Sequence, residues 1–113
     1  MSGMQFGVFS VGDITPDQVN QTTPTEHERL KALITIAKKV EEVGLDVFAL
    51  GEHHNPPFVP SSMTTILSYI GAQTERLITS TSIAHITTND PVKIAEDYTT
   101  MQHLVDGRMD ITF

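Results

Sequence analysis

The chain has 113 residues, of which 39% are hydrophobic and 19% charged, a composition typical of an ordinary globular domain. Acidic residues outnumber lysine and arginine by 14 to 7 and the formal net charge is −7, so the sequence lacks the electrostatic basis of nucleic-acid binding. The absence of cysteine excludes a disulfide framework, a thiolate zinc site and a cysteine nucleophile.

The N-terminal segment predicts a strand rather than a targeting signal. Met1–Ser10 lacks the basic region and the long apolar core of a secretory signal. No apolar run approaches the roughly 18 residues that a membrane span needs, so we expect a cytoplasmic protein without membrane contact. Gln5–Val11 is short, apolar and rich in aromatic and β-branched residues, which predicts a buried strand. Gly12–Pro24 is polar and carries two prolines, which predicts a loop.

A helix is expected to begin directly after this loop. Thr25 and Glu28 have the spacing of a capping box, in which the threonine hydroxyl and the glutamate carboxylate each bond the other residue's backbone N–H. Apolar residues then recur at helical spacing and form one stripe: Leu30, Leu33, Ile34, Ala37 and Val40. Gly44 can adopt the left-handed conformation that ends such a helix.

The same alternation continues through the next part of the chain. Asp46–Leu50 has no polar alternation in its middle, which is typical of a strand covered on both faces. Gly51–Pro60 is a proline-containing loop, and Ser61 or Ser62 is expected to cap a second helix. The apolar face of this helix consists of Met63, Ile66, Leu67 and Ile70.

A third helix is predicted between two further strands. Leu77–Ile86 is the expected third strand, and Met109–Phe113 the fourth. Asp90 followed by Pro91 is an N-cap with proline at the first helical position, a strong start signal, and Gly107 is expected to end this helix.

The strict order of strands and helices implies a parallel sheet with right-handed crossovers, either doubly wound or barrel-like. A glycine-rich phosphate loop after the first strand would favour a doubly wound nucleotide-binding fold. Gly12–Pro16 contains no such G-x-G-x-x-G pattern, which favours the barrel.

Chemically active residues gather where the predicted strands end. They lie in Gly51–His54, in Ala84–Asp90 and at Gly12–Asp13, and functional groups of parallel α/β folds collect at this edge. The carboxylate of Glu52 can orient a neighbouring imidazole. Because adjacent residues near a strand end point to opposite sides, at most one of His53 and His54 is expected to face a barrel mouth. The alternative is that both histidines cap the strand and bond loop carbonyls.

A metal site is a further interpretation of Glu52, His53, His54 and His85. Barrel metallohydrolases commonly space two histidines by one residue, whereas His53 and His54 are adjacent, which disfavours that geometry. On spacing alone, the carboxylates of Glu96 and Asp97 are expected on a solvated helix face.

Two motifs resemble those of the bacterial luciferase-like flavin monooxygenases: Gly51-Glu52-His53-His54, and the run from Asn89 to Asp97. Further segments of the chain match the family in the same order: Phe6-Gly7, Thr74-Glu75-Arg76 and Asp106-Gly107-Arg108. The resemblance covers almost the whole chain. It implies a TIM (βα)8 barrel that binds flavin, usually FMN and in some relatives F420, at the carboxyl end of its strands.

The resemblance also implies roles for particular residues. His53 corresponds to the active-site histidine proposed as a catalytic base, and Glu52 precedes it near the flavin. Ser82 and Ile83 match the site of a non-prolyl cis peptide that lies against the flavin ring. No residue is expected to bind a metal. The family dimerises through the second and third helices, which implies a buried interface role for Glu96 and Asp97.

The resemblance implies that residues 1–113 form a single partial domain, the N-terminal half, (βα)3β, of such a barrel. We expect either a fragment or a chain that assembles with itself. The parent enzyme would oxygenate a small organic substrate with reduced flavin and O2, supported by a flavin reductase, in a pocket lined by Phe58, Val59 and Pro60. Two alternatives remain open: a non-catalytic dimerising or flavin-binding half-barrel, and a metal-dependent barrel hydrolase.

Overall fold

A computed structural model describes residues 3–113, and these residues form a four-stranded sheet with three α-helices. The elements in chain order are β1 (Gly7–Ser10), α1 (Glu26–Glu42), β2 (Val47–Leu50), α2 (Met63–Ala72), β3 (Ile78–Thr81), a 3-10 turn η1 (Ile86–Thr88), α3 (Pro91–Leu104) and β4 (Met109–Asp110).

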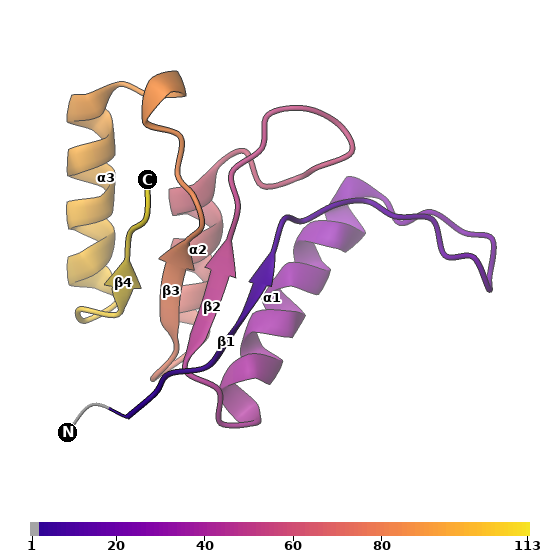
Figure 1. Cartoon of the computed structure of the whole chain (residues 1–113), viewed down its shortest axis with the longest axis horizontal. Coiled ribbons are helices and arrows are strands. Elements are labelled where there is room, and N and C mark those ends of the chain that lie inside the picture. The colour runs from indigo at the N-terminus through magenta and orange to yellow at the C-terminus, as the bar shows by residue number, and fades with distance from the viewer. Residues whose placement is uncertain (1–2) are drawn as a thin grey trace.

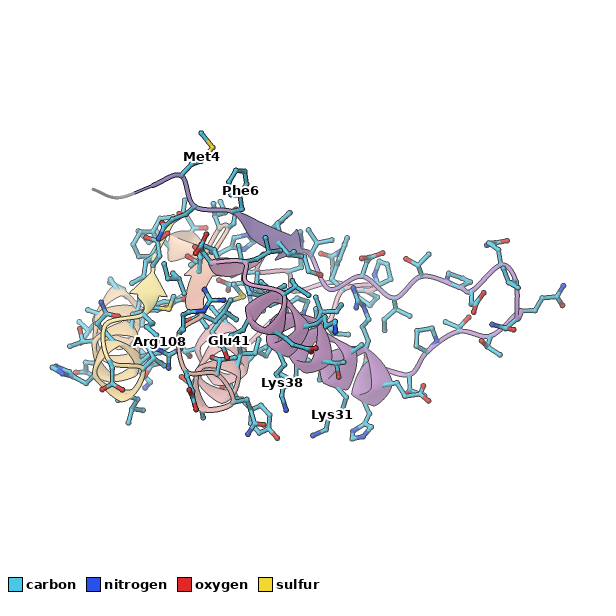
Figure 2. All side chains as sticks on the ribbon, turned by 90° about the horizontal axis from the view of Figure 1, so that it is seen from below. Met4, Phe6, Lys31, Lys38, Glu41 and Arg108 are labelled. Atoms are coloured by element: carbon cyan, nitrogen blue, oxygen red, sulfur yellow. The ribbon has the colours of Figure 1, made fainter. Side chains whose placement is uncertain are left out.

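The strand order decides between the two expected folds. The strands pair in the order β1-β2-β3-β4, and all three pairs are parallel. Because each right-handed crossover moves one strand further in the same direction, every helix is brought to the same face of the sheet. Figures 1 and 2 show the three helices together on that face. A doubly wound sheet would reverse direction and carry helices on both faces, so this sheet is a section of barrel wall.

The hydrophobic core lies between the sheet and the helices. The sheet contributes the fully buried side chains of Phe48 and Leu50, and the expected stripe of α1 packs against them. The remaining buried apolar side chains come mainly from α2, α3 and the segments that flank them: Met63, Ile66, Leu67, Ile70, Leu77, Ala84, Tyr98, Met101, Val105 and Met109. Burial of this area is the main favourable contribution to folding.

The opposite face of the sheet is uncovered among residues 3–113. The register aligns Phe9, Ala49, Ser80 and Asp110 across the strands, on the face away from the helices. Phe9 is 54% exposed. The prediction that the first strand is buried was therefore wrong for one of its faces, because no described element packs against that face.

Helix starts were predicted more accurately than strand ends. The capping box of Thr25 and Glu28 is present, and the Asp90 side chain accepts a hydrogen bond from the Lys93 amide. Ser62 holds the N-cap position of α2, but its side chain makes no capping bond. The third and fourth strands are shorter than predicted. β3 ends at Thr81, and the last residue predicted for it, Ile86, begins η1 instead. β4 pairs with β3 only through Met109 and Asp110.

A carboxylate ties α1 to the segment before β3. Glu41 accepts hydrogen bonds from the backbone amides of Glu75, Arg76 and Leu77 at 2.6–3.2 Å. Burial raises the pKa of Glu41, but these amide bonds outweigh it and hold the pKa below its ordinary value of 4.5. The charge therefore stabilises the connection between the first and third βα units.

Arg108 joins the same end of the sheet from the other side. Its guanidinium donates to the backbone carbonyls of Gly71, Thr74 and Leu77 at 2.9–3.2 Å. Figure 2 shows Arg108 and Glu41 at the end of the molecule that faces the viewer, away from the carboxyl ends of the strands. Side chains at this end of a barrel serve stability rather than chemistry.

Candidate functional site

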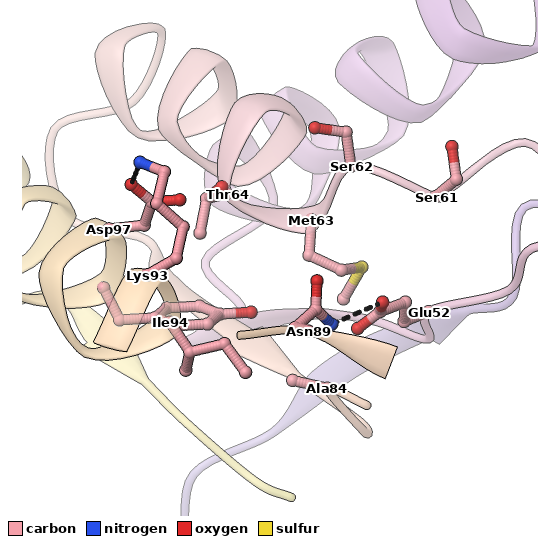
Figure 3. A pocket seen from close by; sticks show the side chains of 11 residues that line it. Glu52, Ser61, Ser62, Met63, Thr64, Ala84, Asn89, Lys93, Ile94 and Asp97 are labelled. Atoms are coloured by element: carbon pink, nitrogen blue, oxygen red, sulfur yellow. Dashed lines mark hydrogen bonds and ion pairs between the residues drawn. The ribbon is translucent and has the colours of Figure 1, made fainter. Parts of the chain in front are cut away.

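The buried side chain of Glu52 organises the carboxyl ends of β2 and β3. It is 4% exposed, and each of its oxygens has a protein partner. One oxygen accepts the His85 amide at 2.7 Å; the other lies 2.6 Å from His54 Nε2 and accepts from the Asn89 side-chain amide at 3.1 Å. Figure 3 marks the Asn89 bond. The residues of two separate loops are thus joined through one carboxylate.

These hydrogen bonds keep Glu52 ionised. Burial raises the pKa of Glu52, since the charged form is disfavoured away from water. The bonds from the His85 amide, His54 and Asn89 have a larger combined effect and hold the pKa below its ordinary value of 4.5. A carboxylate with three donors is satisfied, which fits the absence of any unpartnered buried side-chain polar atom among residues 3–113.

Alternation along β2 separates the two adjacent histidines. Phe48 and Leu50 are buried in the helix-side core. Glu52, Met63 and Tyr98 line a cavity of about 150 Å³ on the same side, and Figure 3 labels Glu52 and Met63 there. His54 bonds Glu52 and shares that side. Pairing continues past Leu50, since the Gly51 amide donates to the Ser10 carbonyl at 3.0 Å and the Glu52 amide to the Ile83 carbonyl at 3.2 Å. From the alternation of this extended backbone we infer that His53 points to the opposite side, toward the uncovered face.

The His53 ring is held by the loop that follows β2. It stacks on Phe58 with ring centroids 4.2 Å apart and an angle of 21° between the planes. The backbone N–H of His53 donates to the carbonyl of Pro60 at 3.0 Å. The ring is half-buried, so it is oriented by packing while part of it stays accessible.

The uncovered face carries small and exposed groups beside Gly51. Ser82 and Ile83 are exposed, Ile83 at 45%, and the peptide bond between them is cis, as the family resemblance implied. A Cβ atom on Gly51 would lie 3.1 Å from the Ser82 carbonyl oxygen and 3.4 Å from the Phe9 ring. Glycine at this position therefore lets the ends of three strands approach closely.

The loop after β1 joins the β2 loop rather than the Glu52 cluster. The Gly12 carbonyl accepts the Val59 amide at 3.0 Å, and the Ile14 amide donates to the Pro57 carbonyl at 2.8 Å. Gly12 has φ of +61°, and a Cβ there would lie 2.6 Å from the Pro60 ring. Three groups of residues were predicted at the strand ends. Gly51–His54 and Ala84–Asp90 meet through Glu52, whereas Gly12–Asp13 contacts the loop that follows His53.

The carboxylates of α3 differ from each other in environment. Glu96 is exposed, whereas Asp97 is half-buried and forms an ion pair with Lys93 one turn earlier. Nearby, burial raises the pKa of Tyr98 to about 12, with further contributions from the charges of Glu52 and Asp97. The expectation of a solvated face holds for Glu96 in the single chain.

Sequence reasoning missed the role of Asn89, which anchors Glu52, and the use of the His85 backbone rather than its ring. The signal available was the convergence of the two strand ends, which brings polar residues of both loops together. Glu52, His54 and His85 also place carboxylate and imidazole ligand atoms within 4.8 Å of one another. His53 is outside this group.

None of the helices among residues 3–113 is both long enough and apolar enough to traverse a bilayer.

Three solved structures have the same fold as this chain. They are the monooxygenase RslO1 from Streptomyces bottropensis (TM-score 0.80, 19% identity), apo-MsnO8 (0.83, 20%) and the FMN complex of the oxygenating constituent of 3,6-diketocamphane monooxygenase from Pseudomonas putida (0.82, 15%). Each match covers 96–97% of this chain and 29–32% of the other. The chain thus has the fold of about a third of each of these longer chains.

Sequence relatives lead to the same family. A luciferase-like monooxygenase of Escherichia coli K12 is 28% identical over 104 residues, which is 91% of this chain and 30% of the relative. The uncharacterized protein YvbT of Bacillus subtilis is 29% identical over 85 residues, 74% of this chain and 25% of its own length. The chain therefore spans about a third or less of these relatives. The family "Luciferase-like monooxygenase" matches residues 4–113, and the chain belongs to that family.

Proposed function

We propose that this chain forms part of the active site of a flavin-dependent monooxygenase, in which reduced FMN and O2 oxygenate a small organic substrate. The observation that carries the proposal is the position of His53, an oriented and accessible imidazole on the uncovered side of the strand ends, in a chain of the luciferase-like family. A bound flavin would supply the oxygen chemistry, and the protein would supply binding, orientation and proton transfer.

His53 is the proposed catalytic base. Its ring is stacked on Phe58 and is separated from the carboxylate of Glu52 by the alternation of the strand. A neutral imidazole has one unprotonated ring nitrogen, which can accept a proton from a substrate. The stacked ring would hold that nitrogen at a fixed position relative to the substrate.

The proposed flavin-contacting residues are Ser82 and Ile83. They present an exposed apolar side chain and a hydroxyl beside Gly51, where the lack of a side chain leaves room for a flat ring. Such a surface, apolar with few polar groups, fits a heteroaromatic cofactor. Glu52 would contribute to cofactor binding indirectly, because it fixes the loop that follows Ser82 and Ile83 through the His85 amide.

The proposed substrate is small and apolar. Phe58 and Val59 are half-buried on the loop beside His53, and Pro60 is buried behind them. These side chains offer an apolar lining at the side of the imidazole. Aldehydes and alkanes are the substrate classes to assay.

The decisive experiment combines flavin binding with turnover, on the protein in the full length that its gene encodes. FMN would be titrated by absorbance and fluorescence, and oxygenated product would be measured with FMN, NADH and a flavin reductase. His53→Ala is expected to slow product formation about 100-fold or more while the Kd for FMN changes less than about threefold. His103→Ala, an exposed histidine on α3, serves as the control.

Activity of His53→Ala within about threefold of the parent would contradict the base role. Parallel titration with F420 tests the cofactor: FMN is expected to bind more tightly. Tighter binding of F420, with reduction of substrate in place of oxygenation, would overturn the FMN assignment.

The proposal extends to assembly and location. We place the protein in the cytoplasm as a homo-oligomer that associates through α2 and α3, whose outer surfaces expose Tyr69 and Leu104. Light scattering after gel filtration tests this: a dimer is expected, and Leu104→Glu should shift it toward the monomer. A monomeric parent protein would refute the oligomer.

A further inference from the structure

The cluster of Glu52, His54 and His85 has the donor set of a transition-metal site. The ligand atoms of these three side chains all lie within 4.8 Å of one another. Two imidazoles and one carboxylate are the protein ligands of many catalytic zinc sites, which leave a fourth position open. The objection that adjacent histidines cannot share a metal does not apply, because the second histidine comes from the loop after β3.

The carboxylate is already oriented for this role. Glu52 is buried, and the His85 amide and the Asn89 side chain hold its two oxygens at 2.7 and 3.1 Å. Outer partners of this kind fix a ligand's orientation in known metal sites. The carboxylate would therefore lose little conformational freedom when a cation binds.

The imidazoles can adjust to a cation. His54 Nε2 lies 2.6 Å from a Glu52 oxygen, and the two rings have centroids 5.9 Å apart. Ligand atoms around a tetrahedral zinc ion are separated by roughly 3.4 Å, given bonds of about 2.1 Å. The His54 side chain is 44% exposed, so a small rotation of its ring opens the required space.

The cluster lies apart from the proposed flavin side. Alternation directs Glu52 and His54 toward the helices and His53 toward the uncovered face. On the His54 side, an open coordination position of the cation would face solvent. Beside Glu52, it would face the cavity of about 150 Å³, which Asn89 and Lys93 also line (Figure 3). A cation here would join the β2 and β3 loops without occupying the position of a flavin.

We propose that Glu52, His54 and His85 bind one Zn²⁺ ion, which cross-links the loops after β2 and β3 on the helix side of the sheet. The test of this proposal does not depend on the flavin assignment, because zinc binding is measured without flavin and the variants that test it leave Glu52 unchanged. Binding would stabilise the folded chain in proportion to the logarithm of the free zinc concentration.

The test uses the full chain without an affinity tag, stripped of metal at pH 7.5. Zn²⁺ is titrated in competition with a chromophoric chelator, and Co²⁺ is added separately to record visible absorption. We expect one Zn²⁺ per chain, an intense Co²⁺ spectrum of low coordination number, and a rise in Tm with zinc. His54→Ala and His85→Ala should each weaken binding by more than the roughly 10- to 100-fold expected for Asn89→Ala.

His53→Ala is the matched control, since it removes an adjacent imidazole on the other side of the strand. It should leave zinc affinity within about threefold of the parent, less than the loss of an outer partner causes. His54 is substantially exposed, so its replacement leaves the fold intact, which circular dichroism verifies. Equal zinc affinity of the parent and His54→Ala, or an equal loss in His53→Ala, would overturn the site.

Discussion

The Glu41 carboxylate offers a direct test of how one charge holds two βα units together. Its oxygen Oε1 accepts three successive backbone amides, those of Glu75, Arg76 and Leu77, at 2.6–3.0 Å. Glu41→Gln keeps one acceptor oxygen in place but removes the charge and the second contact with Glu75. Hydrogen bonds to charged groups contribute about 1 kcal/mol more than neutral ones, which gives about 3 kcal/mol for the three amides. Because Glu41 is only half-buried, solvent screening lowers the expected loss to about 2 kcal/mol. This corresponds to a fall in Tm of roughly 10 °C for a domain of this size.

The pH dependence gives the sharper result. The folded pKa of Glu41 lies below its ordinary value, so its contribution to stability is present above pH 4.5 and is lost as the pH falls through the folded pKa. Urea unfolding of the parent and Glu41→Gln between pH 7 and pH 3 is therefore expected to give curves that converge on acidification. Glu42→Gln, at an adjacent and exposed carboxylate, should leave the unfolding midpoint unchanged. A constant gap between parent and Glu41→Gln at all pH values would refute the reasoning.

Two further predictions concern the packing of α2. Gly71→Ala should destabilise the chain by about 1–3 kcal/mol, although alanine normally favours a helix, because its Cβ would clash with a Val105 methyl group. In denaturant unfolding, adding Val105→Ala should restore part of the lost stability. A Gly71→Ala variant more stable than the parent would contradict this prediction. Arg108→Lys should destabilise the chain by about 1–3 kcal/mol because an ammonium cannot reach the carbonyls of Gly71, Thr74 and Leu77 together; unchanged hydrogen exchange at the end of α2 would argue against this bridge.

The order of strands and helices could be predicted from the sequence, because local signals determine it. Thr25 and Asp90 mark their helices through caps formed within three residues. The same reasoning failed for β1 because the burial of a strand face depends on what packs against it. Apolar composition alone does not distinguish the core-facing Val8 from the exposed Phe9.

Long-range polar contacts could be predicted only in part. The convergence of Glu52 with His85 and Asn89 follows from parallel topology, yet which atom of each residue takes part depends on loop geometry. The Glu41 cluster was not predicted at all, because its carboxylate and the three amides are 34–36 residues apart. On a helical wheel, Glu41 has no property that separates it from the solvated Glu42.

Because side chains alternate at the end of β2, the number of residues between Leu50 and each histidine determines which side of the sheet that imidazole faces. Deletion of Gly51 would reverse the assignments: the imidazole of His53, now beside Phe58, would turn toward Met63 and Tyr98, and that of His54 would replace it at the open face. Two consecutive histidines would keep an imidazole on each side after such a slip, while the carboxylate would change sides. Loss of one residue would therefore leave an imidazole on both sides of the strand end, but it would remove the carboxylate of Glu52 from the helix side.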